Sequence, residues 1–369
     1  MRILAINVGS SSVKCSLTEV SGEADSPERV AESWSAQGPV SSPDQLKDAL
    51  PRWLDPLWRM AGSPRELDAV AHRIVHGGIA HRQTTWLTPE VRAAIAAQAE
   101  FAPSHNRLEL AAIETMDGLL GDRSTRQIAV FDTAFHATME PAAYVYPGPY
   151  EWVELGIRRF GFHGISHAHA ARRAAELLGR SLESLRLITC HLGNGCSLAA
   201  VRGGKSVDTT MGFTPADGLM MGSRCGSIDP GIAVYLLRSG AGLRPAISAA
   251  DDLDRVFNKE SGLKGISGLS GDMREILAAI AAGNARAKLA FDMYAHRLCR
   301  EVGAMLAVLG GLDAIVFTGG VGENCAPLRE RVCGQLGFLD SLKVLVVKAE
   351  EEQQMARECC RLMDSDGGI

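Results

Sequence analysis

The chain lacks the excess of basic residues that a polyanionic partner requires. Among its 369 residues, 38 are Lys or Arg and 43 are Asp or Glu, so the formal net charge at pH 7 is −5. Proteins that bind nucleic acid or an anionic membrane surface usually present a basic face. We therefore expect no nucleic-acid partner and no membrane partner. An anionic ligand of this chain has to be held by a few local groups.

The chain also lacks an apolar run of membrane-spanning length and a recognisable targeting segment. Its N-terminal sequence, MRILAINVGSSS, turns polar too soon for a signal peptide. The nine cysteines are scattered, and no C-x-x-C pair occurs. An odd number of unclustered cysteines is typical of free thiols in a reducing compartment. We expect a cytoplasmic protein.

Several common catalytic motifs are missing. A Walker A loop reads G-x-x-x-x-G-K-[ST], and the sequence Gly204-Lys205-Ser206 comes close, but Ala199 stands where the first glycine is required. We interpret these three residues as a turn between strands. No G-x-G-x-x-G follows an expected strand, and neither H-E-x-x-H nor G-x-S-x-G occurs. These absences argue against a P-loop enzyme, a zinc protease and an α/β-hydrolase.

The sequence does contain a Gly-rich stretch from Ile188 to Gly231. A short apolar strand breaks at residues 191–195, HLGNG, and a second strand resumes at Ser197. A strand that opens into a Gly/Asn turn exposes backbone N–H groups, which can hold a phosphate group. The alternative is a plain β-hairpin with an Asn-Gly turn. The nearby His191 and Arg224 favour a binding site.

A similar pattern opens the chain. Ile3–Val8 is an apolar strand, Gly9–Ser12 is a Gly/Ser turn, and Val13–Val20 is a second strand. Each half also has a later strand that ends in polar or Gly-rich residues, Gln127–Phe135 and Asp313–Asn324, and ligands of α/β sheets gather at such ends. Strands alternate with helical patterns, and 369 residues exceed one ordinary core. We predict an α/β protein of two domains related by internal duplication.

Four side chains near these strand ends are candidates for chemistry. Arg73 and Arg224 either pair with surface carboxylates or bind a small carboxylate or phosphate in a bidentate manner. Asp132 ends an apolar strand and is either a cap of a turn or a ligand of Mg²⁺ in a phosphate site. His163 is either a buried, hydrogen-bonded histidine or a donor to a developing negative charge.

Nine motifs, spread in order from Ile3 to Asn324, resemble those of the acetate and propionate kinase family. They are INVGSSSVK, AHRIVHGG, FAPSHN, VFDTAFH, RRFGFHGISH, ITCHLGNGCSLAAVRGGKSVDTTMGFTP, SRCGSIDPG, SGLSGDMRE and VFTGGVGEN. The resemblance implies a duplicated ribonuclease-H-like fold, shared with actin, hexokinase and sugar kinases, with an active-site cleft between the domains. It implies reversible phosphoryl transfer from ATP to acetate, which gives acetyl phosphate and ADP. It also implies Mg²⁺, or Mn²⁺ in its place, and a homodimer.

The resemblance assigns roles to individual residues. The catalytic groups would be Arg73, Asp132, His163 and Arg224, of which His163 and Arg224 would stabilise the transition state. The acid would be bound by Arg73 and by a small pocket for its methyl group, made of Val75, Phe162 and Pro215. Asn7, Ser10, Ser12 and Lys14 would lie at the first phosphate-side turn, and Asn7 and Glu351 would hold the metal. ATP would be bound by Lys14, His191, Leu192, Gly193, Asn194, Gly195, Asp272, Met273, Arg274, Gly320, Val321, Gly322 and Asn324.

The domains implied by the resemblance are residues 1–133, with a closing helix at 352–369, and a nucleotide-binding domain at 134–351. The C-terminal part departs from the family, because only Gly337–Lys343 connects two elements that the family separates by a few dozen more residues. Glu351 matches the family's metal-associated Glu, but its neighbours differ. Propionate kinase, or another short-chain acyl kinase, is the nearest alternative function. A nucleotide-binding regulator without catalysis is the alternative from another class.

Overall fold

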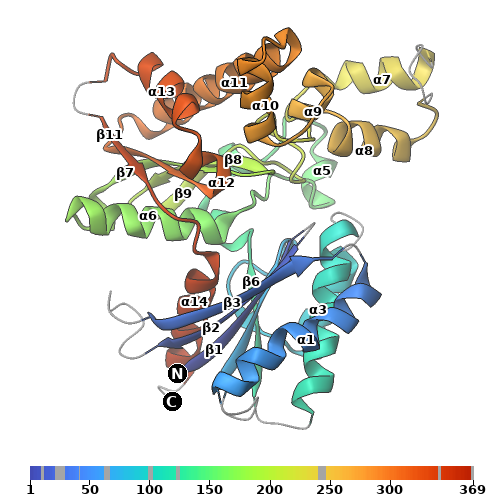
Figure 1. The fold of residues 1–369 in the computed structure, drawn as a ribbon, viewed down its shortest axis with the longest axis vertical. Coiled ribbons are helices and arrows are strands. Elements are labelled where there is room, and N and C mark those ends of the chain that lie inside the picture. Colours follow the sequence, from blue (N-terminus) through green and yellow to red (C-terminus); the bar gives the residue numbers. More distant parts are fainter. Residues whose placement is uncertain are drawn as a thin grey trace. The chain divides into compact units, whose positions relative to one another are not determined.

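The computed structural model describes the chain apart from residues 10–11, 21–29, 41, 62–66, 99–102, 122–124, 240–246, 340–341 and 367–369. The chain forms two compact units (Figure 1). Unit 1 contains Met1–Ala137, Phe162–His169 and Glu350–Ile369, and unit 2 contains Thr138–Gly161 and Ala170–Ala349. The boundaries inferred from the sequence, 133 and 351, stay a prediction.

Unit 1 is built on a six-stranded sheet with the order β3-β2-β1-β4-β6-β5. The first three strands, β1 (Arg2–Val8), β2 (Ser12–Val20) and β3 (Val30–Pro39), form an antiparallel meander. Next to β1, β4 (Ala69–Ile74) and β6 (Arg126–Phe131) run parallel to it, and the short β5 (Thr85–Trp86) closes the edge. The carboxyl ends of β1, β4 and β6 therefore meet at one edge of the sheet.

Both faces of this sheet are covered by helices (Figure 1). Because side chains alternate along a strand, Leu4 and Ile6 of β1 pack in one buried cluster with α1 (Pro43–Ala61) and α3 (Pro103–Leu120). Ile3 and Ala5 pack in another cluster, with α14 (Glu351–Asp366). The helix α2 (Pro89–Ala97) packs against α3, and a 3-10 turn, η3 (Ala134–Thr138), follows β6. The two buried clusters hold the strands, and so the polar residues at their ends, in fixed register.

Unit 2 repeats the same sheet. Its strands are β7 (Arg186–Leu192), β8 (Cys196–Arg202), β9 (Lys205–Thr209), β10 (Ala314–Thr318) and β11 (Lys343–Val346). The order is β11-β10-β7-β8-β9, with β7, β8 and β9 antiparallel and β10 and β11 parallel to β7. This is the order and direction of β3-β2-β1-β4-β6 read from the other end. The predicted α/β duplication is thus confirmed.

Most of the helices lie in unit 2. They are α4 (Pro141–Tyr144), α5 (Glu151–Glu154), α7 (Pro230–Ser239), α8 (Ala250–Lys259), α9 (Gly262–Ser267), α10 (Met273–Ala281), α11 (Ala285–Leu309), α12 (Gly319–Asn324) and α13 (Ala326–Gln335), with the 3-10 turn η4 (Leu182–Ser184). The helix α6 (Gly164–Leu178) begins in unit 1 and ends in unit 2. The chain breaks between α10 and α11 at Gly283, which has a φ of +83°, and the Asn284 side chain caps α11.

The sequence pattern indicated no strand at residues 30–39, but they form β3, which pairs along β2 through its backbone. One sequence-based interpretation was wrong. Lys205 and Ser206 were expected in a turn, but they begin β9, where Lys205 pairs with Arg202 and Ser206 with Val201. Gly203 and Gly204 make that turn instead, because their φ angles of +58° and +78° suit glycine.

The cysteines are all unbridged thiols, as the sequence predicted. In the described part of the chain, no helix combines the length and the apolar character that crossing a bilayer requires.

Candidate functional site

Unit 1 gathers four of the predicted polar residues at the carboxyl ends of β1, β4 and β6. The guanidinium of Arg73 donates from Nη2 to Asp132 Oδ2 at 2.6 Å and from Nε to both carboxylate oxygens at 3.2 Å. Its Nη1 donates to Asn7 Oδ1 at 2.8 Å and lies 3.7 Å from Glu351 Oε2. The side chain of Asn7 donates in turn to Glu351 and Glu352, at 2.8 Å each. We call these five side chains the Arg73 cluster.

The Arg73 cluster is largely withdrawn from solvent. The side chains of Arg73, Asp132 and Glu351 are 12%, 1% and 11% exposed. Burial alone would lower the pKa of Arg73, but the carboxylates of Asp132 and Glu351 outweigh that effect and raise its pKa. Arg73 is therefore charged at every physiological pH. The cluster contains one guanidinium and three carboxyl groups, so it has an excess of negative charge.

His163 lies beside this cluster in a conformation that few residues adopt. Its φ is +57°, and it is the one non-glycine residue with positive φ in the described part of the chain. The backbone N–H of His163 hydrogen-bonds to the Asp132 side chain, and that of Gly164 donates to the Asp132 carbonyl at 2.9 Å. A left-handed histidine costs energy that the surrounding contacts must offset, and such strain clusters at functional sites.

The predicted lining of the methyl pocket is distributed over both units. Val75 and Phe162 are in unit 1, where they are 3% and 1% exposed. The Phe162 ring contacts His76 edge-on, with 5.5 Å between the ring centroids. Pro215 belongs to unit 2, where its carbonyl accepts a hydrogen bond from Arg224 at 3.2 Å. Of the first phosphate-side turn, Ser10 and the Ser12 side chain lie outside the described residues, and Lys14 is exposed on β2.

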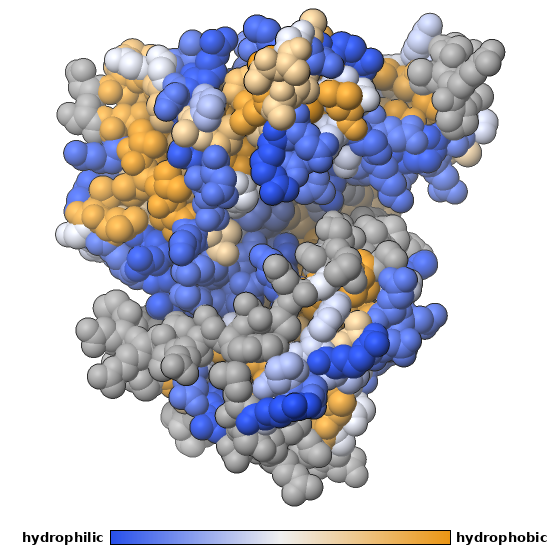
Figure 2. All heavy atoms as spheres, viewed as in Figure 1, coloured by the Kyte–Doolittle hydropathy of each residue, from blue (hydrophilic) through white to orange (hydrophobic). Residues whose placement is uncertain are grey.

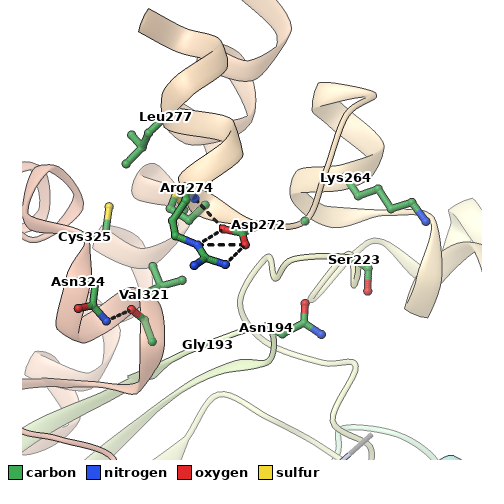
Figure 3. A pocket seen from close by; sticks show the side chains of 13 residues that line it. Gly193, Asn194, Ser223, Lys264, Asp272, Arg274, Leu277, Val321, Asn324 and Cys325 are labelled. Carbon is green, nitrogen blue, oxygen red and sulfur yellow. Dashed lines mark hydrogen bonds and ion pairs between the residues drawn. The ribbon is translucent and has the colours of Figure 1, made fainter. Parts of the chain in front are cut away.

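Unit 2 contains a cavity of about 870 Å³ (Figure 3). It opens at the carboxyl ends of β7 and β10, because its walls include the turn after β7 and the helix α12 that follows β10. The predicted ATP-binding residues that line it are Gly193, Asn194, Asp272, Met273, Arg274, Gly320, Val321 and Asn324. Apolar walls with a few convergent polar groups are typical of a small-molecule site.

Hydrogen bonds between neighbouring side chains and backbone shape this cavity. Asp272 caps α10, because its Oδ1 accepts from the Arg274 backbone N–H at 2.8 Å, and its carboxylate also binds the Arg274 guanidinium. Asn324 Nδ2 donates to the Gly320 carbonyl at 2.9 Å across α12 (Figure 3). The Asn194 carbonyl accepts from the Gly222 N–H at 3.1 Å. These contacts fix three separate segments around one opening.

The structure divides the predicted ATP set. His191, Leu192, Gly195 and Gly322 are in unit 2 but do not line the cavity, and Leu192 is fully buried in the core. Lys14 belongs to unit 1. Sequence reasoning missed five residues that do line the cavity, namely Ser223, Lys264, Gly271, Leu277 and Cys325. Lys264 could have been suspected as a basic residue at a Gly-rich turn, and Ser223 and Gly271 lie within the motifs SRCGSIDPG and SGLSGDMRE, whereas Leu277 and Cys325 carried no signal.

Arg224 lies in the loop between β9 and α7. Its guanidinium donates to the Pro215 carbonyl and lies near Met221 Sδ, and within the described ranges no carboxylate forms an ion pair with it. Burial lowers the pKa of Arg224. A guanidinium that is partly desolvated without an anionic partner favours binding of an anion from outside the chain.

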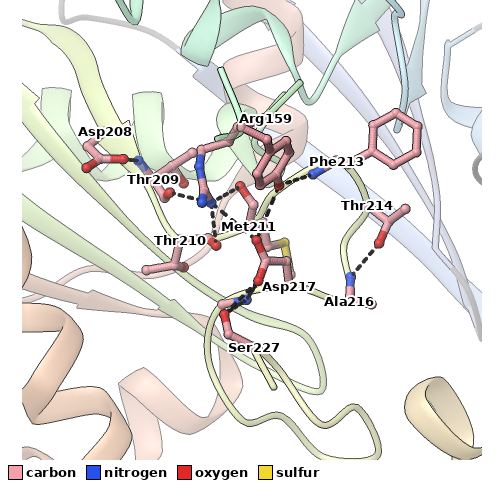
Figure 4. A network of polar contacts seen from close by, with 12 residues as sticks. Arg159, Asp208, Thr209, Thr210, Met211, Phe213, Thr214, Ala216, Asp217 and Ser227 are labelled. Atoms are coloured by element: carbon pink, nitrogen blue, oxygen red, sulfur yellow. Dashed lines mark hydrogen bonds and ion pairs between the residues drawn. The ribbon is translucent and has the colours of Figure 1, made fainter. Parts of the chain in front are cut away.

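A polar network holds this loop in shape (Figure 4). Arg159 Nη1 donates to three successive carbonyls, those of Thr209, Thr210 and Met211, at 3.1, 2.8 and 3.1 Å. Asp217 accepts from Ser227 Oγ at 2.6 Å and from the Gly218 N–H at 2.8 Å, which ties the two ends of the segment that bears Arg224. Side-chain hydrogen bonds therefore fix the conformation of this loop, although it has little regular secondary structure.

Comparisons with known proteins agree with this architecture. The chain is similar to a solved acetate kinase from Porphyromonas gingivalis, with a TM-score of 0.84, 35% identity and coverage of 98% of this chain and 99% of that one. It is also similar to a solved propionate kinase from Francisella tularensis, with a TM-score of 0.83, 32% identity and coverage of 97% and 98%. The fold thus defines a two-unit α/β kinase, and the predicted fold class is confirmed.

The particular family follows from the sequence match. The acetokinase family model matches residues 2–361. An acetate kinase from a Synechococcus species is 47% identical over an alignment of 416 positions, gaps included. The alignment covers 99% of this chain and all of the relative. The chain belongs to the acetokinase family, a family of ATP-dependent enzymes. The predicted family and enzyme class, a phosphotransferase with a carboxyl group as acceptor, are confirmed.

Proposed function

We propose that this protein transfers a phosphoryl group reversibly between ATP and acetate, by direct in-line transfer, giving acetyl phosphate and ADP. The observation that carries the proposal is the match to an acetate kinase over the whole chain at 47% identity. The two built sites support it. One is a cavity of nucleotide size, and the other is a buried guanidinium cluster suited to a small acid.

The cavity of unit 2 binds the nucleotide in this proposal. Met273, Leu277 and Val321 supply an apolar surface for the base, and Asn194, Lys264 and Asn324 supply polar groups. The backbone N–H groups of the turn after β7 are suited to phosphate oxygens, because glycine permits a close approach. His191, next to that turn, is the proposed donor to the phosphates.

The acid and the transferring group are bound by arginines. Arg73, held in a fixed plane by Asp132 and Asn7, binds the acid carboxylate, and Arg224 binds the transferring phosphoryl group. His163 donates to the charge that develops in the transition state. Phosphoryl transfer depends on positioning and charge neutralisation, so these groups suffice without a covalent step on the protein.

The donor set at the end of β1 fits Mg²⁺. Asn7 offers an amide oxygen, and Glu351 and Glu352 offer carboxylates, the hard oxygen ligands that Mg²⁺ prefers. The excess of carboxyl groups over guanidinium in the Arg73 cluster also favours a cation. We assign Asn7 and Glu351 to Mg²⁺, which, when bound, neutralises phosphate charge.

Propionate is the second candidate substrate. The similarity to a propionate kinase, with a TM-score of 0.83, favours it as an additional acid. Val75 and Phe162 line the proposed methyl pocket, and one methylene changes binding by only ~1–3 kcal/mol. We therefore expect acetate to be preferred over propionate by a factor of roughly 10 to 100, rather than absolutely.

The test is acyl phosphate formation with ATP and Mg²⁺, trapped as the hydroxamate, over acetate, propionate and butyrate. We expect the highest kcat/KM with acetate, and Arg224→Ala to lower kcat by ~10²–10³-fold, as removal of a transition-state charge donor does. No product with any of the acids would mean a nucleotide-binding protein without catalysis. A higher kcat/KM for propionate would reverse the assignment of the acid.

A homodimer is part of the proposal. The short helix α7 leaves four apolar side chains at least 44% exposed, namely Ile232, Val234, Tyr235 and Leu237. Four exposed apolar side chains on one ten-residue helix are unfavourable in water and favour an interface. We propose that two copies of the chain bury α7 against each other.

A further inference from the structure

Glu109 is a buried carboxyl group that none of the assignments above uses. It lies on α3 and is 1% exposed. Its Oε1 accepts a hydrogen bond from the backbone N–H of Val75 at 3.0 Å, directly after β4. Its Oε2 is buried without a hydrogen-bond partner in the described part of the chain. Glu109 therefore holds the segment that carries both Arg73 and Val75 through Oε1, and Oε2 makes no hydrogen bond to the described residues.

Burial disfavours the ionised form of Glu109. Of the nearby charged groups, Arg73 favours that form and Asp132 disfavours it. Arg73 already donates to Asp132 and Asn7 and lies close to Glu351. Its positive charge therefore interacts with two carboxylates besides Glu109. An ionised Glu109, with the Val75 N–H on Oε1 and no direct donor on Oε2, would be a buried charge that is only partly compensated.

The other charged groups that face α3 are already paired. From α1, Lys47 pairs with Glu114 at 2.8 Å, and from α2, Arg92 pairs with Asp117. On the segment after β4, the buried His76 accepts from the Gly78 N–H through Nδ1, and its ring contacts Phe162. Burial, the largest cause, raises the pKa of Glu109 to about 8, although Arg73 and the Val75 N–H act in the opposite direction.

We propose that Glu109 is a positioning residue for the acid substrate, and that its protonated form holds the Arg73–Val75 segment ready for the carboxylate. When Glu109 ionises, its negative charge weakens the electrostatic attraction between Arg73 and the substrate carboxylate. The affinity for the acid then falls at alkaline pH, whereas the nucleotide cavity of unit 2 is unaffected. The proposal rests on the assignment of Arg73 and Val75 to the acid.

The experiment compares the KM for acetate of the wild type, Glu109→Gln and Glu109→Ala between pH 6.5 and 9.5. We expect the wild-type KM to rise roughly 3- to 10-fold above pH 8, and Glu109→Gln, which keeps the acceptor and cannot ionise, to show no such rise. Glu109→Ala leaves the Val75 N–H without its acceptor, and we expect a KM about tenfold higher at pH 7 with a much smaller change in kcat.

Glu114→Gln is the matched control, because Glu114 lies on the same helix but forms an exposed pair with Lys47. We expect its pH profile to follow the wild type. ADP affinity and the thermal midpoint report whether each variant is folded. If Glu109→Gln keeps the wild-type rise in KM, the inference is wrong. If the wild type itself forms no acyl phosphate, the proposed function fails instead, so the two failures are distinguishable.

Discussion

His72 shows how a single buried residue links stability to pH. It lies on β4 with its ring buried, Nε2 is 2.8 Å from Gln127 Oε1, and Nδ1 has no partner in the described part of the chain. Burial, as the main cause, lowers its pKa from 6.5 to about 4. The unfolded chain therefore takes up a proton between pH 6.5 and 4 that the folded chain does not, and the folded state loses stability as the pH falls through this window.

We expect His72 to lower the free energy of unfolding by roughly 2–3 kcal/mol between pH 7 and pH 4.5, at 1.36 kcal/mol for each unit of the pKa shift. The variant His72→Gln removes the titrating group and should lack this part of the acid sensitivity. Urea unfolding of both proteins at the two pH values measures it. Equal losses in both proteins would show that other groups cause the acid sensitivity.

At the scale of single elements, α6 begins where backbone packing leaves no room for a side chain. A Cβ on Gly164 would lie 2.1 Å from the Asp132 carbonyl oxygen and 2.9 Å from Phe135 Cβ. The N–H of Gly164 also donates to that carbonyl. The start of the helix therefore fixes both Asp132, at the end of β6, and His163, the residue before the helix.

We expect Gly164→Ala to shift Asp132 and His163 and to lower kcat/KM by at least ~10²-fold, since small misplacements of catalytic groups have effects of that size. The control is Gly303→Ala within α11, where nothing lies within 4 Å of the added Cβ. That change should stabilise the fold by ~0.5–1 kcal/mol through helix propensity and leave activity intact. Steady-state kinetics and thermal unfolding measure both. Wild-type activity in Gly164→Ala would contradict the tight fit.

At the scale of the whole molecule, the exposed apolar side chains of the described residues include two groups. One is on α7, and the other is on and before the edge strand β11, where Phe338, Val344 and Val346 are 69%, 43% and 46% exposed. Figure 2 shows apolar side chains at the upper left, where Figure 1 places β11. The resemblance to the family implies a shortened connection before β11, and the alignment with the Synechococcus relative spans 416 residues against 369 in this chain.

The dimer proposal places the interface on α7 and not on β11, and substitutions can test this. A charge placed in an interface is strongly unfavourable, so we expect Tyr235→Glu on α7 to give a monomer. The matched change on the other patch, Val344→Glu on β11, should leave the dimer intact. Sedimentation velocity over a range of protein concentrations measures both. A wild type that sediments as a monomer at every concentration would exclude the dimer.

Short-range patterns in the sequence predicted most of the strands and the duplication, and the resemblance to the acetate and propionate kinase family supplied much of the cavity lining. Apolar strands that end in Gly/Asn or Gly/Ser turns are visible in the sequence, and so are the arginines beside them. Sequence reasoning did not reach β3, whose sequence is polar and whose pairing comes from backbone bonds to β2. It also missed Ser223, Gly271 and Cys325, since these residues come from three segments far apart in the chain that only the folded structure brings to one cavity.

The sequence by itself determined the family and the alternation of strands and helices, because these follow from motifs and local pattern. The tertiary structure decided which side chains meet. Asn7 and Glu351 hydrogen-bond across a separation of 344 residues, and Glu109 reaches the N–H of Val75 from another element. Hydrogen bonds and the energy of a buried charge depend on distances of a few ångströms, and those distances are set only when the sheet and its helices pack.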